Sequence, residues 1–272
     1  MPVLKDITIG QYYPGKSLIH RMDPRMKIVI TFAYIIMLFV AKNAWSFLVG
    51  IGFLVIAYAI SGVPWKMALK GLKPIIPIVI FTTILNMFFI DGDPLWQWGF
   101  IKITDRGISM AIMMAIRIFC LIAGTSLLTY TTSPIVLTDG LERLMSPLKK
   151  IKVPVHELAM MMTIALRFIP TLIEETDKIM NAQKARGADL ESGKLLQRVK
   201  ALIPVLIPLF VSAFRRADEL ALAMECRCYR GGEGRTRMKQ LKLHSRDIVS
   251  AVFVAVCIGG IIALNYFFPS LF

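Results

Sequence analysis

The sequence predicts an all-α, polytopic membrane protein with about five transmembrane helices and a cytoplasmic insertion of long amphipathic helices. Three observations lead to this prediction: the composition, the lengths of the uncharged runs and the distribution of basic residues. Of 272 residues, 56% are hydrophobic and 18% are charged, yet 32 lysines and arginines against 18 acids give a net charge of +14. This combination excludes a disordered chain and is not typical of a soluble enzyme.

The uncharged runs locate the membrane spans. A bilayer core needs about 20 apolar residues in a helix. Four runs contain no charged side chain and a fifth contains only Arg117: residues 28–41, 43–65, 74–90, 248–272 and 107–138. Because the first run is short, we expect Lys27 and Lys42 to reach from it toward the headgroups. The expected spans lie near 26–42, 44–62, 74–91, 107–130 and 247–268.

The distribution of lysine and arginine predicts the orientation, because basic residues accumulate in cytoplasmic segments. Five precede residue 28, three lie in 63–73 and twenty lie in 131–246, where there are twelve acids. We therefore expect a multi-pass protein of the cell membrane whose N-terminus and residues 131–246 are cytoplasmic. The basic excess is then explained by membrane orientation, so no nucleic-acid partner is expected.

This orientation divides the chain into three expected domains. Residues 1–130 form an N-terminal membrane domain with four spans, 131–246 form a cytoplasmic helical domain, and 247–272 form a last transmembrane helix. In the cytoplasmic domain, apolar residues recur at helical spacing from 157 to 186 and from 195 to about 226. We expect two long helices, the first about 45 Å in length and kinked at Pro170.

Both long helices end in an arginine between small residues. The first ends in Ala185-Arg186-Gly187 and the second in Cys226-Arg227-Cys228. Two similar basic ends suggest two similar receptors, because the planar guanidinium can pair with a carboxylate through two hydrogen bonds. The alternative is that these are ordinary exposed helix ends, where the helix dipole favours arginine.

Other chemical motifs point away from an enzyme. Residues 10–17 match the phosphate-loop pattern G-x-x-x-x-G-K-S, but a membrane span follows them where an α/β sheet would be required. The three histidines are far apart, and Cys226 and Cys228 have no second Cys/His pair at metal-site spacing. We therefore expect no catalytic residues, no metal and no cofactor. A channel or secondary transporter remains a less favoured alternative, which would require inverted repeats.

Four segments, in order along nearly the whole chain, resemble a known family. They are Ser17-Leu-Ile-His-Arg-Met-Asp-Pro-Arg-Met-Lys27, Arg167-Phe-Ile-Pro-Thr-Leu172, Ala182-Gln-Lys-Ala-Arg-Gly-Ala188 and Ala221-Leu-Ala-Met-Glu-Cys-Arg-Cys-Tyr229. Together they resemble the transmembrane coupling subunits of energy-coupling factor (ECF) vitamin transporters, the EcfT/CbiQ family. One departure is that cysteines flank Arg227, where the family usually has an Ala-Arg-Gly-like motif.

The resemblance implies a non-catalytic transmembrane scaffold of an ATP-driven vitamin or micronutrient importer. Two cytoplasmic ABC-type ATPase subunits would bind the ATP and accept the helix ends at residues 185–187 and 226–228. The two long helices would pass the ATPase motion to a membrane-embedded substrate-binding (S) subunit, which can be interchangeable in this family. A coupling subunit of a dedicated cobalt, nickel or biotin system is the closest alternative.

Three further assignments stay open at the level of sequence. Met160, Met161 and Met162 are expected to contact the S subunit, because flexible thioethers suit surfaces that accept several partners; the alternative is gap-filling in a helix bundle. The alternatives for Arg117 are that it lines a polar path, or that it faces the bundle interior or helix partners or lies near the membrane boundary. The alternatives for Asp23 and Arg25 are that they cap and anchor the first span, or that they pair with the long helices.

Overall fold

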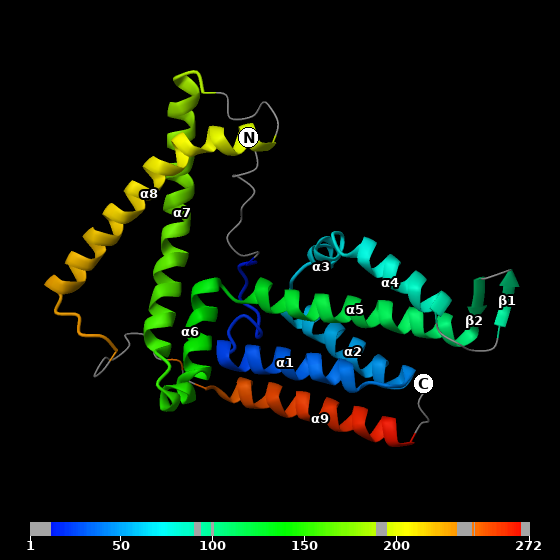
Figure 1. Ribbon diagram of the computed structural model, residues 1–272. Helices are drawn as coiled ribbons and strands as arrows, with labels where there is room; N and C mark the ends of the chain where they lie inside the picture. Colours follow the sequence, from blue (N-terminus) through cyan, green and yellow to red (C-terminus); the bar gives the residue numbers. More distant parts are fainter. Residues whose placement is uncertain are drawn as a thin grey trace. The chain divides into compact units, whose positions relative to one another are not determined.

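The computed structural model describes residues 12–89, 94–98, 101–188, 195–232, 241 and 243–267. Within these residues the regular structure is helical apart from one short hairpin, which confirms the predicted all-α membrane fold (Figure 1). The chain forms two compact units. The bundle unit comprises residues 10–140 and 240–272, and the insertion unit comprises residues 141–239.

The helices of the bundle unit are α1 (Pro24–Val40), α2 (Ala44–Ser61), α3 (Trp65–Leu72), α4 (Ile76–Phe89), α5 (Asp105–Thr131) and α9 (Ser245–Phe267). Helix α6 (Pro134–Leu144) leads from this unit into the insertion unit. There it is followed by a short 3₁₀ helix, η2 (Ser146–Ile151), and by α7 (Val155–Ala185) and α8 (Leu195–Cys226).

Local signals in the sequence set several helix ends. Asp23 caps α1, since its carboxylate accepts a hydrogen bond from the backbone N–H of Arg25, and Pro24 occupies the first helical position. Gly62 ends α2 in the left-handed conformation, with φ of 69°. Thr104 caps α5 by accepting a hydrogen bond of 3.1 Å from the N–H of Gly107.

Several helices are long and apolar enough to cross a membrane. They are α2, α5, α9 and, by the same measure, α7 of the insertion unit. Helices α3 and α4 form a further candidate span that is bent by 65° at the break of residues 73–75, which contains Pro74. Helix α1, with 17 residues, is about 25 Å long, slightly short of a 30 Å hydrocarbon core.

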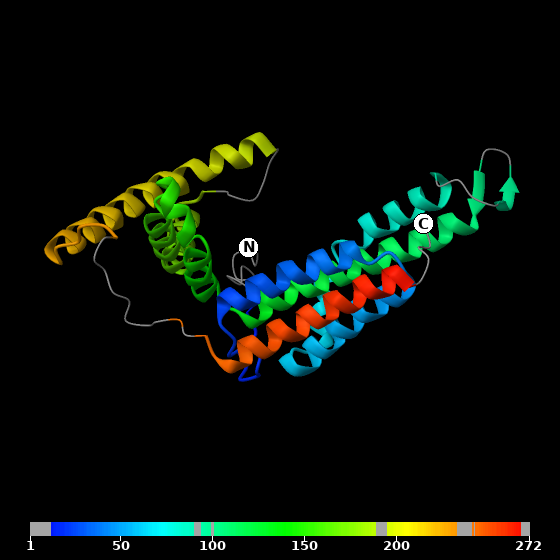
Figure 2. The same ribbon diagram turned by 90° about the horizontal axis from the view of Figure 1, so that it is seen from below.

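The core of the bundle unit lies between α1, α2, α5 and α9, which run side by side in two views (Figures 1 and 2). Tyr34 and Phe253 both stack on Phe53, with ring centroids 5.3 and 5.8 Å away, so that α1, α2 and α9 share one aromatic cluster. Gly124 lets α5 approach closely, because a Cβ there would lie 2.4 Å from the ring of Tyr34. Small residues at helix contacts are typical of membrane bundles.

A hairpin connects α4 to α5, between the expected spans 74–91 and 107–130, where the sequence predicted no strand. Strands β1 (Pro94–Trp98) and β2 (Ile101–Thr104) pair antiparallel, with an irregular register between Pro94 and Trp96. Aromatic and β-branched residues, which favour strands, are concentrated in both. A short strand of this kind is hard to distinguish from a loop by sequence pattern alone.

Candidate functional site

Helices α7 and α8 of the insertion unit form a crossed, antiparallel pair. The amide of Gln183 donates to the carbonyl of Pro204 at 3.2 Å. Nearer the start of α7, the carboxylate of Glu175 accepts hydrogen bonds from the Ser212 hydroxyl and, at 2.6 Å, from Arg216. Residue numbers fall along α7 as they rise along α8, so the C-terminal ends of the two helices lie at opposite ends of the pair (Figure 1).

The C-terminal end of α7 is a Schellman turn. Gly187 adopts φ of 85°, and its N–H donates to the carbonyl of Lys184 at 2.9 Å. The N–H of Ala188 reaches back to the carbonyl of Gln183 at 3.0 Å. These two bonds satisfy carbonyls that the helix end would otherwise leave unpaired, and glycine suits the left-handed position. Arg186 is the last residue before this turn.

The C-terminal end of α8 repeats the same turn with a cysteine in the glycine position. Cys228 has φ of 54°, and its N–H donates to the carbonyl of Glu225 at 2.8 Å. The N–H of Tyr229 donates to the carbonyl of Met224 at 3.0 Å. Arg227 therefore occupies the position that Arg186 has in the first turn, although its neighbours differ.

The arginines at both ends are exposed to solvent, as are the small residues on either side of each. Within the described part of the chain, neither guanidinium has an ion pair or a side-chain hydrogen bond, whereas Arg216 is paired with Glu175. The six predicted residues thus form two separate helix ends that share the same turn, Ala185-Arg186-Gly187 and Cys226-Arg227-Cys228. Each end presents one exposed arginine that has no charged partner among the described residues.

The segment after the second end packs back on the first turn of α7, a contact that the sequence does not predict. A Cβ on Gly232 would lie 2.6 Å from the imidazole of His156. His156 is in turn 3.1 Å from the carboxylate of Glu142 on α6. The only sequence signal was Gly231-Gly232, which indicated the end of a helix but not its partner.

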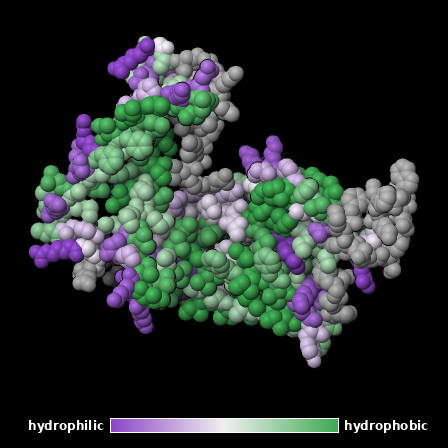
Figure 3. Space-filling model, viewed as in Figure 1, coloured by the Kyte–Doolittle hydropathy of each residue, from purple (hydrophilic) through white to green (hydrophobic). Residues whose placement is uncertain are grey.

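The long helices also carry exposed apolar surface. Met161 and Met162 are 54% and 48% exposed, whereas Met160 is half-buried. Helix α8 has a stripe of exposed large side chains at helical spacing, which Figure 3 shows as hydrophobic surface along that helix. The stripe consists of Leu196, Val199, Ile203, Ile207, Phe210 and Phe214. Apolar surface of this extent is typical of a protein or membrane contact.

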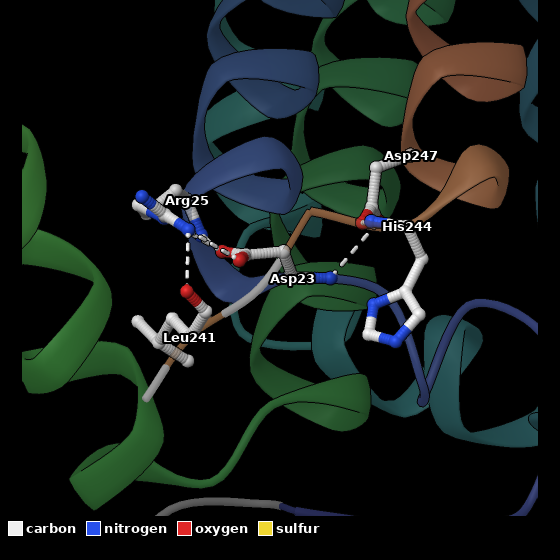
Figure 4. Close-up of polar contacts among 5 residues, drawn as sticks. All are labelled: Asp23, Arg25, Leu241, His244 and Asp247. Carbon is white, nitrogen blue, oxygen red and sulfur yellow. Dashed lines mark hydrogen bonds and ion pairs between the residues drawn. The ribbon is translucent and has the colours of Figure 1, made fainter. Parts of the chain in front are cut away.

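In the bundle unit, the motif before the first span ties α1 to the start of α9 (Figure 4). The Arg25 guanidinium donates to both carboxylate oxygens of Asp23, at 3.0 and 2.8 Å, and also to the carbonyl of Leu241. The carboxylate of Asp247 accepts hydrogen bonds from the backbone N–H groups of Asp23 at 3.0 Å and His244 at 2.8 Å. The first span is therefore capped and anchored, and its partners lie next to the last span.

The surroundings of Asp23 favour the ionised form of its carboxylate. Burial opposes its charge, but the hydrogen bonds from Arg25 and the positive charge of Arg25, with a smaller contribution from the nearby His244, outweigh burial and lower the pKa of Asp23. Asp247 was not singled out from the sequence, because only the tertiary structure brings it to Asp23.

Lys27 departs from its expected setting, whereas Arg117 takes one of the settings that the sequence left open, facing neighbouring helices of the bundle. Lys27 does not reach toward the headgroups: its ammonium is buried and donates to the carbonyls of His20 and Thr131 and to the hydroxyl of Thr132. Arg117 lies at the junction of α1 and α2, where it donates to the carbonyl of Ala41 and lies 5.1 Å from the ring centroid of Phe47. Both side chains join helix ends within the bundle.

No group of three potential metal ligands occurs among the described residues. Of the segment that resembles a phosphate loop, residues 10 and 11 lie outside the described residues. The rest is occupied by internal contacts, since Ser17 is hydrogen-bonded to His20 at 2.7 Å and a Cβ on Gly15 would lie 2.7 Å from the same imidazole.

Comparison with known proteins gives one consistent result. The family model described as CbiQ, cobalt transport protein, matches residues 15–238. The energy-coupling factor transporter transmembrane protein EcfT of Ruminiclostridium cellulolyticum is 58% identical over 266 residues, which cover 98% of this chain and 100% of that protein. The EcfT proteins of Clostridium kluyveri and Bacillus subtilis are 57% and 50% identical, with 94% and 93% of this chain and 97% of each protein covered.

Proposed function

Because this chain belongs to the CbiQ family of energy-coupling factor transporter transmembrane proteins, we propose that α7 and α8 couple the motion of two ATPase subunits to transport. The chain is a non-catalytic, multi-pass membrane component of an ECF transporter. One observation supports the coupling proposal most directly. The two helices end in the same turn, at opposite ends of a crossed pair, and each end presents an exposed arginine.

Each arginine end docks into a groove of one cytoplasmic ABC-type ATPase subunit. Arg186 and Arg227 pair there with carboxylates, because a guanidinium that leaves water needs a bidentate acidic partner. The flanking small residues at 185, 187, 226 and 228 let the helix end enter the groove. ATP is bound by those subunits, and this chain needs no cofactor of its own.

The crossing of α7 and α8 transmits the movement. Glu175 holds Ser212 and Arg216 of the opposite helix, so a displacement of one end is passed to the other helix. ATP binding draws the ATPase subunits together and moves both ends. The two helices then pass this movement to the protein that is bound to their apolar surface.

That surface holds the membrane-embedded S subunit. The exposed thioethers of Met161 and Met162, together with Met160, and the apolar stripe on α8 supply an adaptable contact that fits interchangeable partners. Substrate specificity resides in the S subunit. The transported compound is a vitamin or, in a dedicated system, cobalt, nickel or biotin.

The arginine ends are tested by charge reversal in the complete transporter. Arg186→Glu combined with Arg227→Glu places like charges against the acidic grooves and weakens docking by more than roughly 30-fold at each end. ATP-driven uptake in proteoliposomes is then lost, while the amount of chain in the membrane is unchanged.

The matched control reverses two exposed arginines of the same unit that lie away from the ends, Arg143→Glu and Arg215→Glu. This control variant should retain ATP-driven uptake and keep both ATPase subunits bound. Normal transport by the Arg186/Arg227 variant would refute the coupling proposal.

The methionine cluster is tested by co-purification. Replacement of Met160, Met161 and Met162 by Lys puts three charges on the proposed contact, so the S subunit is lost from the purified complex and uptake stops. The two ATPase subunits remain bound, which shows that the chain is folded. An unchanged yield of the S subunit would place its contact elsewhere.

A further inference from the structure

A groove in the bundle unit lies on the inner side of the bend between α3 and α4. It has a volume of about 820 Å³, and α5 forms its third wall. Its two parts differ in chemistry. Lys66, Lys70 and Lys73 line the part at α3, and the remaining wall is apolar, with Val79 and Ile80 from α4 and Ile116 and Phe119 from α5 among its residues.

The three lysines act together because of their spacing. Positions 66, 70 and 73 follow the i, i+4, i+7 pattern, which puts them on one side of a helix. All three are exposed. Among the residues that the structure describes, no carboxylate pairs with any of them, and none lines the groove. The groove therefore has a concentrated, uncompensated positive charge at one end.

Helix α3 lies beside the last turn of α5, at one end of that candidate membrane span. The hydroxyl of Tyr130, in the last turn of α5, donates to the carbonyl of Met67 at 3.0 Å. Trp65 stacks on Tyr58 with ring centroids 4.7 Å apart and remains 45% exposed. An exposed tryptophan near the end of a span is typical of the membrane interface, so we place α3 at the level of the headgroups. Figure 3 shows hydrophilic groups at α3 beside hydrophobic surface over α4.

We propose that this groove binds an anionic phospholipid. The phosphate lies against Lys66, Lys70 and Lys73, and an acyl chain runs along the apolar wall of α4 and α5. The charge pattern favours a lipid over a protein helix, because a basic cluster at headgroup level beside an apolar wall matches an amphiphile with one negative end. A bound lipid would brace the 65° bend between α3 and α4.

The test measures which lipid stays on the full chain. The protein is placed in nanodiscs with equal amounts of phosphatidylglycerol and phosphatidylcholine, and retained lipid is identified by native mass spectrometry. The unmodified chain retains phosphatidylglycerol. Replacing Lys66, Lys70 and Lys73 by Gln lowers the preference for phosphatidylglycerol over phosphatidylcholine by roughly fivefold per lysine. Val79→Trp fills the apolar part of the groove and lowers lipid retention while all three lysines remain in place.

The matched control replaces Lys149, Lys150 and Lys152 by Gln, which removes the same charge from exposed positions of the insertion unit and leaves the selectivity unchanged. Equal selectivity in the groove variant and the control would overturn the proposal. A photoreactive residue at Ile80 distinguishes the occupants in native membranes. A lipid adduct supports the proposal, and a polypeptide adduct overturns it in favour of a protein contact.

Discussion

Cys228 is the residue at which this chain departs from the usual form of its helix end. The position requires φ of 54°, which glycine adopts freely and an L-residue with a Cβ adopts at a cost of about 1 kcal/mol. The turn nevertheless forms, because the N–H groups of Cys228 and Tyr229 satisfy the last carbonyls of α8. A small side chain is tolerated where a β-branched one would not be.

Cys228→Gly is therefore expected to stabilise the turn by about 1 kcal/mol. The measurement is hydrogen exchange of the Tyr229 amide, which should slow about fivefold. Cys226→Gly is a matched control that should change the stability in the opposite direction. Residue 226 is helical, and glycine there costs about 1 kcal/mol. Equal exchange rates in the two variants would contradict the strain at position 228.

At the scale of elements, one carboxylate joins the first and last spans. Asp247 lies in the first turn of α9 and accepts the N–H of His244, as the acidic residue of a capping box does. Its other oxygen accepts the N–H of Asp23, at the cap of α1. Both bonds are shielded from water, since Asp247 is only 1% exposed. This tie fixes where the chain re-enters the bundle after the insertion.

Asp247→Ala leaves two backbone donors without their acceptor, at a cost of about 1–3 kcal/mol each. Asp247→Asn retains one carbonyl oxygen and should cost about half as much. We expect the apparent melting temperature of the purified chain in detergent to fall in the order wild type, Asn, Ala.

Asp218→Ala, at an exposed acid on α8, serves as the control for loss of one negative charge. If it destabilises the chain as much as Asp247→Ala does, the tie between α1 and α9 is not the cause.

At the scale of the whole molecule, the proposed membrane orientation would account for the net charge of +14. Twenty of the 32 basic residues lie in residues 131–246, and eight more lie before residue 28 or within 63–73. The proposed orientation puts all these segments in the cytoplasm, where the ATPase subunits are. The turn between α1 and α2, which holds Lys42, is then outside.

Cysteine labelling tests this orientation. In a cysteine-free background, Lys42→Cys should react with a membrane-impermeant maleimide in intact cells. Ser146→Cys, which is also exposed in the structure, should react only after the membrane is opened. Labelling of position 146 in intact cells would reverse the orientation, and with it the docking of cytoplasmic ATPases at the helix ends.

Most of the helices and both arginine ends could be predicted from the sequence, because they depend on interactions between near neighbours. Apolar periodicity predicted α7 and α8 to within two residues of their observed limits. Helix ends are likewise local, since a Schellman turn involves six consecutive residues. The hairpin β1–β2 was missed because a strand of four or five residues gives a weak pattern.

The sequence by itself determined the family, the helical spans and the two arginine ends, since hydrophobic periodicity and short motifs encode them directly. Only the tertiary structure decided which distant groups meet. The hydrogen bond from Asp23 to Asp247 joins residues 224 positions apart. Lys27 turns inward to Thr131 rather than toward the headgroups, and Glu175 pairs with Arg216 of the opposite helix. Such contacts follow from how helices pack against one another, and a buried polar group takes whichever partner that packing brings within hydrogen-bonding distance.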